Sequence, residues 1–96
     1  MIIRSVRHQG LKRLIEANQT RGLRPDLVNR VRNILTALAV AEDMKMFRAS
    51  APPGWRVHRL SGDRKGIWSI STSGNWRITF EEEDGYVGDL NLEDYH

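Results

Sequence analysis

Cysteine is absent from the 96 residues of this chain, and its absence excludes three kinds of chemistry. Without thiols the protein forms no disulfide, performs no thiolate catalysis and builds no thiolate metal site. Histidine is scarce, and His8, His58 and His96 do not fall at an HxxH or HExxH spacing, so no metal site is predicted. Imidazole remains available for proton transfer, because its ordinary pKa lies near neutrality.

Long hydrophobic runs and low-complexity segments are also missing. The longest apolar helical stretch, around residues 34–41, is far too short to span a membrane. Arg4 and Arg7 follow the first apolar residues at once, so the start does not resemble a signal peptide. Chains of this length form one domain, and we therefore expect residues 1–96 to be a single cytoplasmic domain without a membrane partner.

Acidic residues are sparse in the first two thirds of the chain. The net charge is +3, and the acids cluster late, at residues 81–84 and 93–94. An excess of basic residues favours an anionic partner such as nucleic acid or an acidic protein. It is equally typical of a well-solvated small protein, so charge alone leaves both interpretations open.

The second half of the chain predicts a β-hairpin. Residues 67–71 and 76–82 each alternate apolar with polar side chains, and residues 72–75 between them favour a turn. The apolar side chains of both strands must share one face, so Arg77 falls on the opposite face. A charge in the middle of a sheet, beside a basic loop, indicates chemistry rather than packing.

The first half predicts two helices. Apolar residues recur at helical spacing from about residue 9 until near Gly22, and again from Pro25 through residue 41. Proline and the following acid, Asp26, suit the first turn of the second helix. Residues 42–48 are expected to add one more turn.

Strands are expected at residues 2–6, 55–60, 67–71, 76–82 and 86–92. The resulting order is β-α-α-β-β-β-β. This order predicts an α+β fold, with two N-terminal helices packed on one face of a mostly antiparallel sheet. The other face of the sheet would be open to solvent or to a ligand.

Side chains suited to catalysis cluster at the chain end and on the expected open face. Asp94, Tyr95 and His96 place a carboxylate, a phenol and an imidazole past the last strand, where they could meet His58 and Arg77. These groups suit metal-free RNA cleavage, with a base for the 2′-hydroxyl, an acid for the 5′-oxygen and a cation for the charged phosphorane. Terminal residues are more commonly a solvated tail, and a lone strand histidine is usually packed or on the surface.

Two further features could contact RNA. Trp55, near a strand end, is the best candidate for an exposed tryptophan that stacks on a base, although strand tryptophans usually belong to the core. Residues 62–66 form a basic hairpin tip in which Arg64 and Lys65 could hold phosphates, or a solvated turn. His8, before the first helix, is expected to be structural or solvent-facing.

Three segments together resemble a known family. They are residues 60–70, the Asn-Trp-Arg-Ile-Thr-Phe run at 75–80, and the terminal Glu-Asp-Tyr-His at 93–96. They resemble the HigB toxins of bacterial type II toxin-antitoxin systems, in the RelE/ParE superfamily, and the opening at residues 8–12 also fits. The resemblance implies a RelE-like fold and a toxin that enters the ribosomal decoding site and cleaves messenger RNA during translation, without a cofactor.

The same resemblance implies partners for the chain. They are the 70S ribosome with its messenger RNA, and a HigA-type antitoxin with a helix-turn-helix domain. Operator DNA would be bound only through that antitoxin.

The resemblance also implies residue roles. The family's catalytic residues fall on His58, Asp94, Tyr95 and His96, and Arg77 corresponds to its phosphate contact.

One position departs from the family pattern, because close relatives often carry lysine where this chain has Ser61. A missing cation there is expected to weaken substrate binding or to shift that task to Arg64 and Lys65.

Two alternatives stay open. One is a ParE-like toxin that inhibits DNA gyrase without cleaving RNA, against which the set of His58, Asp94, Tyr95 and His96 argues. The other is a noncatalytic module whose basic patch binds an acidic partner. Toxicity that survives the loss of His96 and Asp94 would favour either alternative over the nuclease.

Overall fold

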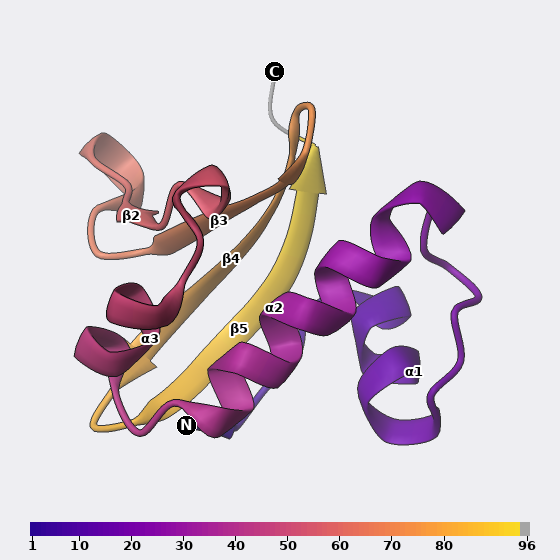
Figure 1. Ribbon diagram of the computed structural model, residues 1–96, viewed down its shortest axis with the longest axis horizontal. Helices are drawn as coiled ribbons and strands as arrows, with labels where there is room; N and C mark the ends of the chain where they lie inside the picture. The colour runs from indigo at the N-terminus through magenta and orange to yellow at the C-terminus, as the bar shows by residue number, and fades with distance from the viewer. Residues whose placement is uncertain (95–96) are drawn as a thin grey trace.

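The computed structural model describes residues 1–94, and within them three helices accompany a five-stranded sheet (Figure 1). The helices are α1 (Gln9–Ala17), α2 (Val28–Val40) and α3 (Met44–Ser50). The strands are β1 (Ile2–Ile3), β2 (His58–Arg59), β3 (Trp68–Ser73), β4 (Trp76–Glu83) and β5 (Tyr86–Asp94). Short 3-10 turns cover Pro25–Leu27, Pro53–Trp55 and Gly62–Arg64. The α+β fold expected from the sequence is confirmed, with one helix more than expected.

The sheet has the strand order β1-β5-β4-β3-β2. β1 runs parallel to β5, whereas all other neighbouring pairs in this sheet are antiparallel. Both edge strands are shorter than expected. Beyond β1, the expected first strand continues only as a bridge between Val6 and Leu90. At the other edge, β2 is reduced to two residues because a 3-10 turn precedes it and Arg56 adopts a left-handed φ of 49°.

The ends of α1 follow from local capping. His8 is its N-cap, and the Nδ1 atom of this residue accepts a hydrogen bond from the Leu11 amide at 3.3 Å. Of the two roles expected for His8, structural or solvent-facing, the structure shows the structural one. The helix ends well before Gly22, because Asn18 adopts a left-handed φ of 54°.

The turn expected at residues 42–48 is a separate helix, α3. Ala41 is extended and ends α2, and Asp43 then caps α3 by accepting from the Met46 amide at 2.8 Å. A capping carboxylate satisfies an amide that would otherwise lack a partner at a helix start, so it favours a new helix over a continuation of the previous one.

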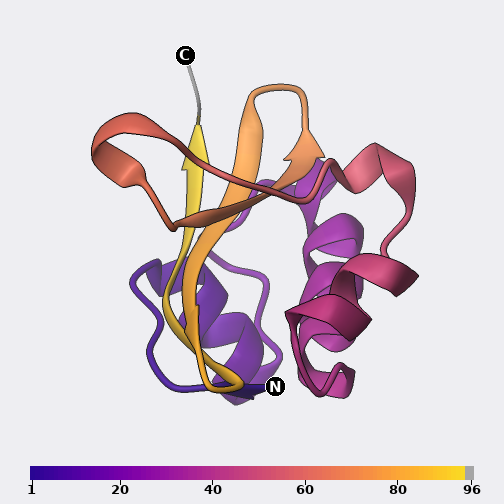
Figure 2. The same ribbon diagram turned by 90° about the vertical axis from the view of Figure 1, so that its left-hand side faces the viewer.

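The apolar face of the sheet packs against the helices, as the alternation predicted. Figures 1 and 2 show α2 and α3 covering this face. The largest fully buried side chains include Leu27, Val31, Ile34, Leu38 and Phe47 from the helical layer and Ile70, Ile78, Phe80, Val87 and Leu90 from the strands. Within the described part of the chain, no helix is long and apolar enough to cross a membrane.

Candidate functional site

The opposite face of the sheet is polar, and its register brings together residues from four strands. His58 on β2 pairs with Ser69 on β3, Ser71 on β3 pairs with Arg77 on β4, and Arg77 pairs with Glu93 on β5. Side chains of directly opposed residues project from the same face of a sheet. Residues separated by 35 positions in the chain are thus neighbours on one surface.

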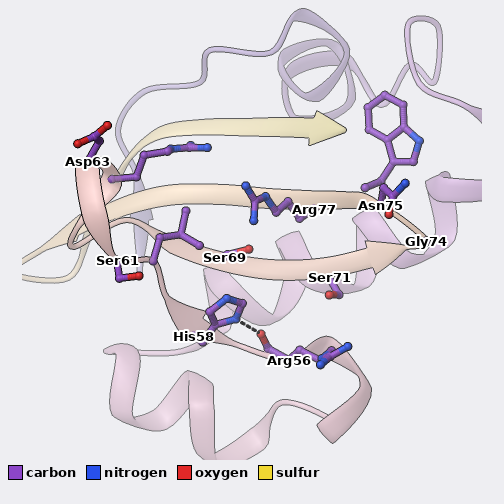
Figure 3. A pocket seen from close by; sticks show the side chains of 12 residues that line it. Arg56, His58, Ser61, Asp63, Ser69, Ser71, Gly74, Asn75 and Arg77 are labelled. Atoms are coloured by element: carbon purple, nitrogen blue, oxygen red, sulfur yellow. Dashed lines mark hydrogen bonds between the residues drawn. The ribbon is translucent and has the colours of Figure 1, made fainter. Parts of the chain in front are cut away.

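A cleft of about 650 Å³ lies on this polar face (Figure 3). Among its described lining residues, three are arginines (Arg56, Arg64 and Arg77) and one is a carboxylate, Asp63. The remainder of the lining is Ser61, Ser69, Ser71, Asn75, Gly74, Leu60, Trp76 and His58. A hollow with this excess of positive charge concentrates anions such as phosphate groups.

His58 is exposed and reaches into the cleft from β2 (Figure 3). Its Nδ1 atom lies 2.7 Å from the carbonyl oxygen of Arg56. A carbonyl oxygen only accepts hydrogen bonds, so Nδ1 carries the proton in this arrangement. In the neutral ring Nε2 then holds the lone pair, which suits the residue to accept a proton from a ligand.

Arg77 occupies the middle of the polar face and is half-buried. Figure 3 shows its side chain lying over the sheet on the same side as His58. A guanidinium presents a planar fork of N–H donors that matches phosphate oxygens. The cleft therefore combines a proton acceptor on β2 and a phosphate-binding group on β4, with β3 between them.

Arg64 is bound to Glu93 across the cleft rim. Its Nη1 and Nη2 atoms donate to Oε1 and Oε2 of Glu93 at 2.7 Å and 2.6 Å, and the Thr79 hydroxyl also donates to Oε2. The hydrogen bonds from Arg64, followed by the one from Thr79 and the positive charge of Arg77, lower the pKa of Glu93 to about 2. Glu93 is thus ionised throughout the neutral range and does not transfer protons there.

Two residues of this site, Arg56 and Glu93, were not expected from the sequence. Arg56 stands two positions before His58, and this spacing was a signal that both could face the same way. Glu93 belongs to the site because it lies opposite Arg77 and within reach of Arg64. Those relations depend on strand register, which no local pattern specifies.

Lys65, expected to share phosphate binding with Arg64, is absent from the lining of the cleft. It lines a separate depression together with Glu81, Glu82 and Glu83. The two basic residues of the loop therefore line different hollows, and of these two only Arg64 lines the cleft.

The prediction that Trp55 is exposed was wrong. This side chain is only 9% exposed and packs against Phe47 with ring centroids 6.2 Å apart. The 3-10 turn at Pro53–Trp55 folds the indole into the core instead of placing it on a strand. Trp76 lines the cleft in its place.

The terminal residues are described only in part. Asp94 is exposed at the end of β5 and pairs with Trp76 of β4, next to the cleft-lining end of that strand. Tyr95 and His96 lie outside the described residues, so their catalytic roles stay predictions.

Comparison with known proteins supplies the family. A model described as "RelE-like toxin of type II toxin-antitoxin system HigB" matches residues 4–96. A protein of Proteus vulgaris named Endoribonuclease HigB is 39% identical over 95 residues, which cover 99% of this chain and 100% of that protein.

Solved structures share the fold. YafQ from Escherichia coli strain BL21(DE3) superposes with a TM-score of 0.63 at 13% identity, covering 96% of this chain and 90% of that one. A mutant of E. coli YafQ gives a TM-score of 0.62 at 16% identity, with the same coverage. At such low identity these likenesses concern the fold alone.

Proposed function

This chain belongs to the family of RelE-like HigB toxins of type II toxin-antitoxin systems, and we propose that it is an endoribonuclease that cleaves messenger RNA on the ribosome during translation. The observation that carries the proposal is the placement of His58 and Arg77 on adjacent parts of one cationic cleft. The full-length similarity to a protein named as an endoribonuclease supports the same reaction.

In the proposed reaction, Nε2 of His58 takes the proton from a ribose 2′-hydroxyl. The 2′-oxygen forms a bond to phosphorus while the bond from phosphorus to the 5′-oxygen breaks, leaving a cyclic phosphate and a 5′-hydroxyl. Arg77, assisted by Arg64, stabilises the additional negative charge on the phosphorane. General acid and general base catalysis each contribute about 10²–10⁴-fold in rate.

We assign the acid to the chain end. Asp94 is the last residue of β5, and Tyr95 and His96 come next in the sequence. The family resemblance supports one of the three as the donor of a proton to the departing 5′-oxygen. Asp94 could also orient an imidazole, and Tyr95 could stack on a base. The proposed reaction uses no cofactor.

The proposed partners follow from family membership. A type II toxin is neutralised by a protein antitoxin, here of the HigA type with a helix-turn-helix domain. The complex would bind operator DNA through the antitoxin, and the free toxin would act on the 70S ribosome in the cytoplasm.

The test is primer extension on a defined message in a reconstituted translation extract. The wild type is compared with His58→Ala, with Asp94→Ala and with a chain lacking His96, and Asp89→Asn serves as a matched carboxylate control on β5 outside the cleft. Ribosome-dependent cuts at discrete codons that are lost in the three site variants but kept in the control would support the nuclease. Growth arrest in cells without any cleavage would reject it and favour a ParE-like inhibitor of DNA gyrase, or a noncatalytic binding module.

A further inference from the structure

Glu93 is not among the residues that line the cleft. It lines a neighbouring depression with Thr79 and Asn91, whereas Arg64 lines both hollows. Arg64 therefore borders both the cleft and the depression that Glu93 lines, and its guanidinium contacts the Glu93 carboxylate. Among the described contacts, Arg64 is the cleft-lining side chain that hydrogen-bonds to Glu93.

The contact fixes the orientation of Arg64 and leaves it able to bind. Each terminal nitrogen uses one N–H on a different carboxylate oxygen, which holds the guanidinium plane and leaves its other N–H groups for a ligand. The Arg64 side chain is 43% exposed and that of Glu93 is 23% exposed. Arg64 is the more exposed member of the pair, so it is the member better placed to meet a partner from solvent.

A third contact distinguishes this pair from an ordinary surface ion pair. The hydroxyl of Thr79, a residue only 2% exposed, donates to the same carboxylate. Exposed pairs such as Arg7 with Asp89, at 3.6 Å with side chains 67% and 52% exposed, are held by no such third donor among the described contacts. Thr79 thus anchors Glu93 to the sheet, and Glu93 in turn anchors the loop that carries Arg64.

We propose that Glu93 is a positioning residue for RNA: acting through Arg64, it holds the loop of Gly62–Arg64 against the sheet and presents a preoriented guanidinium to a substrate phosphate. The inference rests on the proposed function for its substrate. It also explains how this loop supplies one fixed cation to the cleft, although Ser61 is uncharged and Lys65 lines a different hollow.

A double-mutant cycle tests the inference by binding alone. The probe is a short single-stranded RNA with 2′-O-methyl groups, which cannot be cleaved, and its affinity is measured by fluorescence anisotropy. Glu93→Gln is expected to weaken binding about tenfold in the wild-type background, as expected for loss of an oriented charge-assisted contact. It is expected to have no further effect in the Arg64→Ala background, because the residue through which it acts is gone.

Two companion variants separate positioning from simple folding. Asp89→Asn removes the same kind of charge from the same strand, and binding is expected to stay within about twofold, since that pair is exposed. Thr79→Val removes only the third donor, so a smaller loss of about threefold is expected. In cleavage assays Glu93→Gln should raise the KM and leave kcat nearly unchanged.

Three results would overturn the inference. Tighter RNA binding by Glu93→Gln would mean that the carboxylate merely repels the substrate, and equal weakening with and without Arg64 would mean that it acts by another route. If the wild type does not bind the RNA, then RNA is not the ligand of this cleft and Glu93 cannot position it. A wild type that binds and obeys the cycle but never cleaves on ribosomes would reject the nuclease and leave the positioning role standing.

Discussion

Two adjacent cross-strand pairs of the same hairpin have opposite surroundings. Ile70 and Ile78 face the helices and are fully buried, whereas their neighbours Ser71 and Arg77 face the cleft. Because strand side chains alternate, a shift of one residue in register would exchange the two sets. One face of the sheet therefore supplies the stability of the fold and the other carries the residues proposed for cleavage. A substitution on one face should change one property and leave the other nearly unchanged.

The two faces also differ in the interactions that stabilise their side chains. On the helical side, burial of apolar area supplies the stabilisation. On the cleft side, the buried hydroxyl of Thr79 and the ionised Glu93 satisfy each other and Arg64. Changes on the two faces should therefore produce different measurable losses.

The largest expected effect is on the cleft side, in cleavage rate. His58→Ala should lower single-turnover messenger RNA cleavage by about 10²–10⁴-fold, because it removes the proposed base. Its melting temperature should hardly change, since the side chain is exposed. The matched control His8→Ala removes an imidazole outside the cleft and should keep cleavage while losing about 1 kcal/mol of stability with its helix cap. If His58→Ala kept full cleavage activity, His58 would not be the base, and the assignment of the chemistry to the cleft face would be contradicted.

The next largest effect is on the helical side, in stability. Ile78→Ala should lower the free energy of unfolding by about 2–5 kcal/mol, because the side chain is fully buried and leaves a cavity. Cleavage per folded molecule should stay the same. Urea unfolding measures the loss, with Ser71→Ala on the other face as a control expected to change stability far less. A loss below about 1 kcal/mol for Ile78→Ala would contradict this prediction and would show that the core collapses to fill the cavity at residue 78.

Trp76 belongs to both sides of the comparison between the two faces, because it packs against the core and also lines the cleft. Trp76→Ala should weaken binding of single-stranded RNA by about 1–3 kcal/mol, the usual contribution of an aromatic side chain that stacks on a base. Trp55→Phe, a change within the core, is the control and should leave binding unaltered. Equal binding by Trp76→Ala and wild type would exclude this indole from substrate recognition.

The smallest expected effect is the loss of the stabilisation by Glu93 at low pH. The pKa of Glu93 is about 2 in the folded chain, below its ordinary value of about 4.3, so the folded state favours the ionised form. Its stabilisation is complete above the ordinary value and is lost as the pH falls toward 2. Allowing for solvent screening, about 1–2 kcal/mol is involved.

Urea titrations between neutral pH and pH 2 measure this effect as the difference between wild type and Glu93→Gln. The difference should shrink as the pH falls through this range. A difference independent of pH would show that the Arg64 contact contributes nothing in solution.

Local periodicity predicted most of the framework. Alternation in residues 67–71 and 76–82 specified the two central strands and which side chains are buried, and the apolar stripe after Pro25 specified α2. Both signals are readable because strand and helix repeats are properties of neighbouring residues. The same alternation placed Arg77 on the polar face, and the motifs at residues 60–70 and 93–96 indicated the family that the comparisons show.

Short elements were predicted less well. β2 is two residues long and follows a 3-10 turn, so Trp55 lies in the core and not at an exposed strand end. α3 is separated from α2 by the cap at Asp43. A turn of a few residues is decided by what it packs against, and an apolar residue within it has no periodic neighbours to indicate its direction.

By itself, the sequence determined which residues face the helices and which face the opposite side of the sheet. Only the tertiary structure decided which polar residues meet. The register of β4 with β5 places Glu93 opposite Arg77. This register changes between Thr79 and Glu81, where Asp89 on β5 adopts a left-handed φ of 50°. The pairing at Arg77 therefore differs in register from the pairing next to the turn that joins the two strands. Arg64 then reaches Glu93 across 29 positions. Such contacts depend on long-range hydrogen bonding and loop packing, whereas periodicity specifies only the face on which a side chain lies.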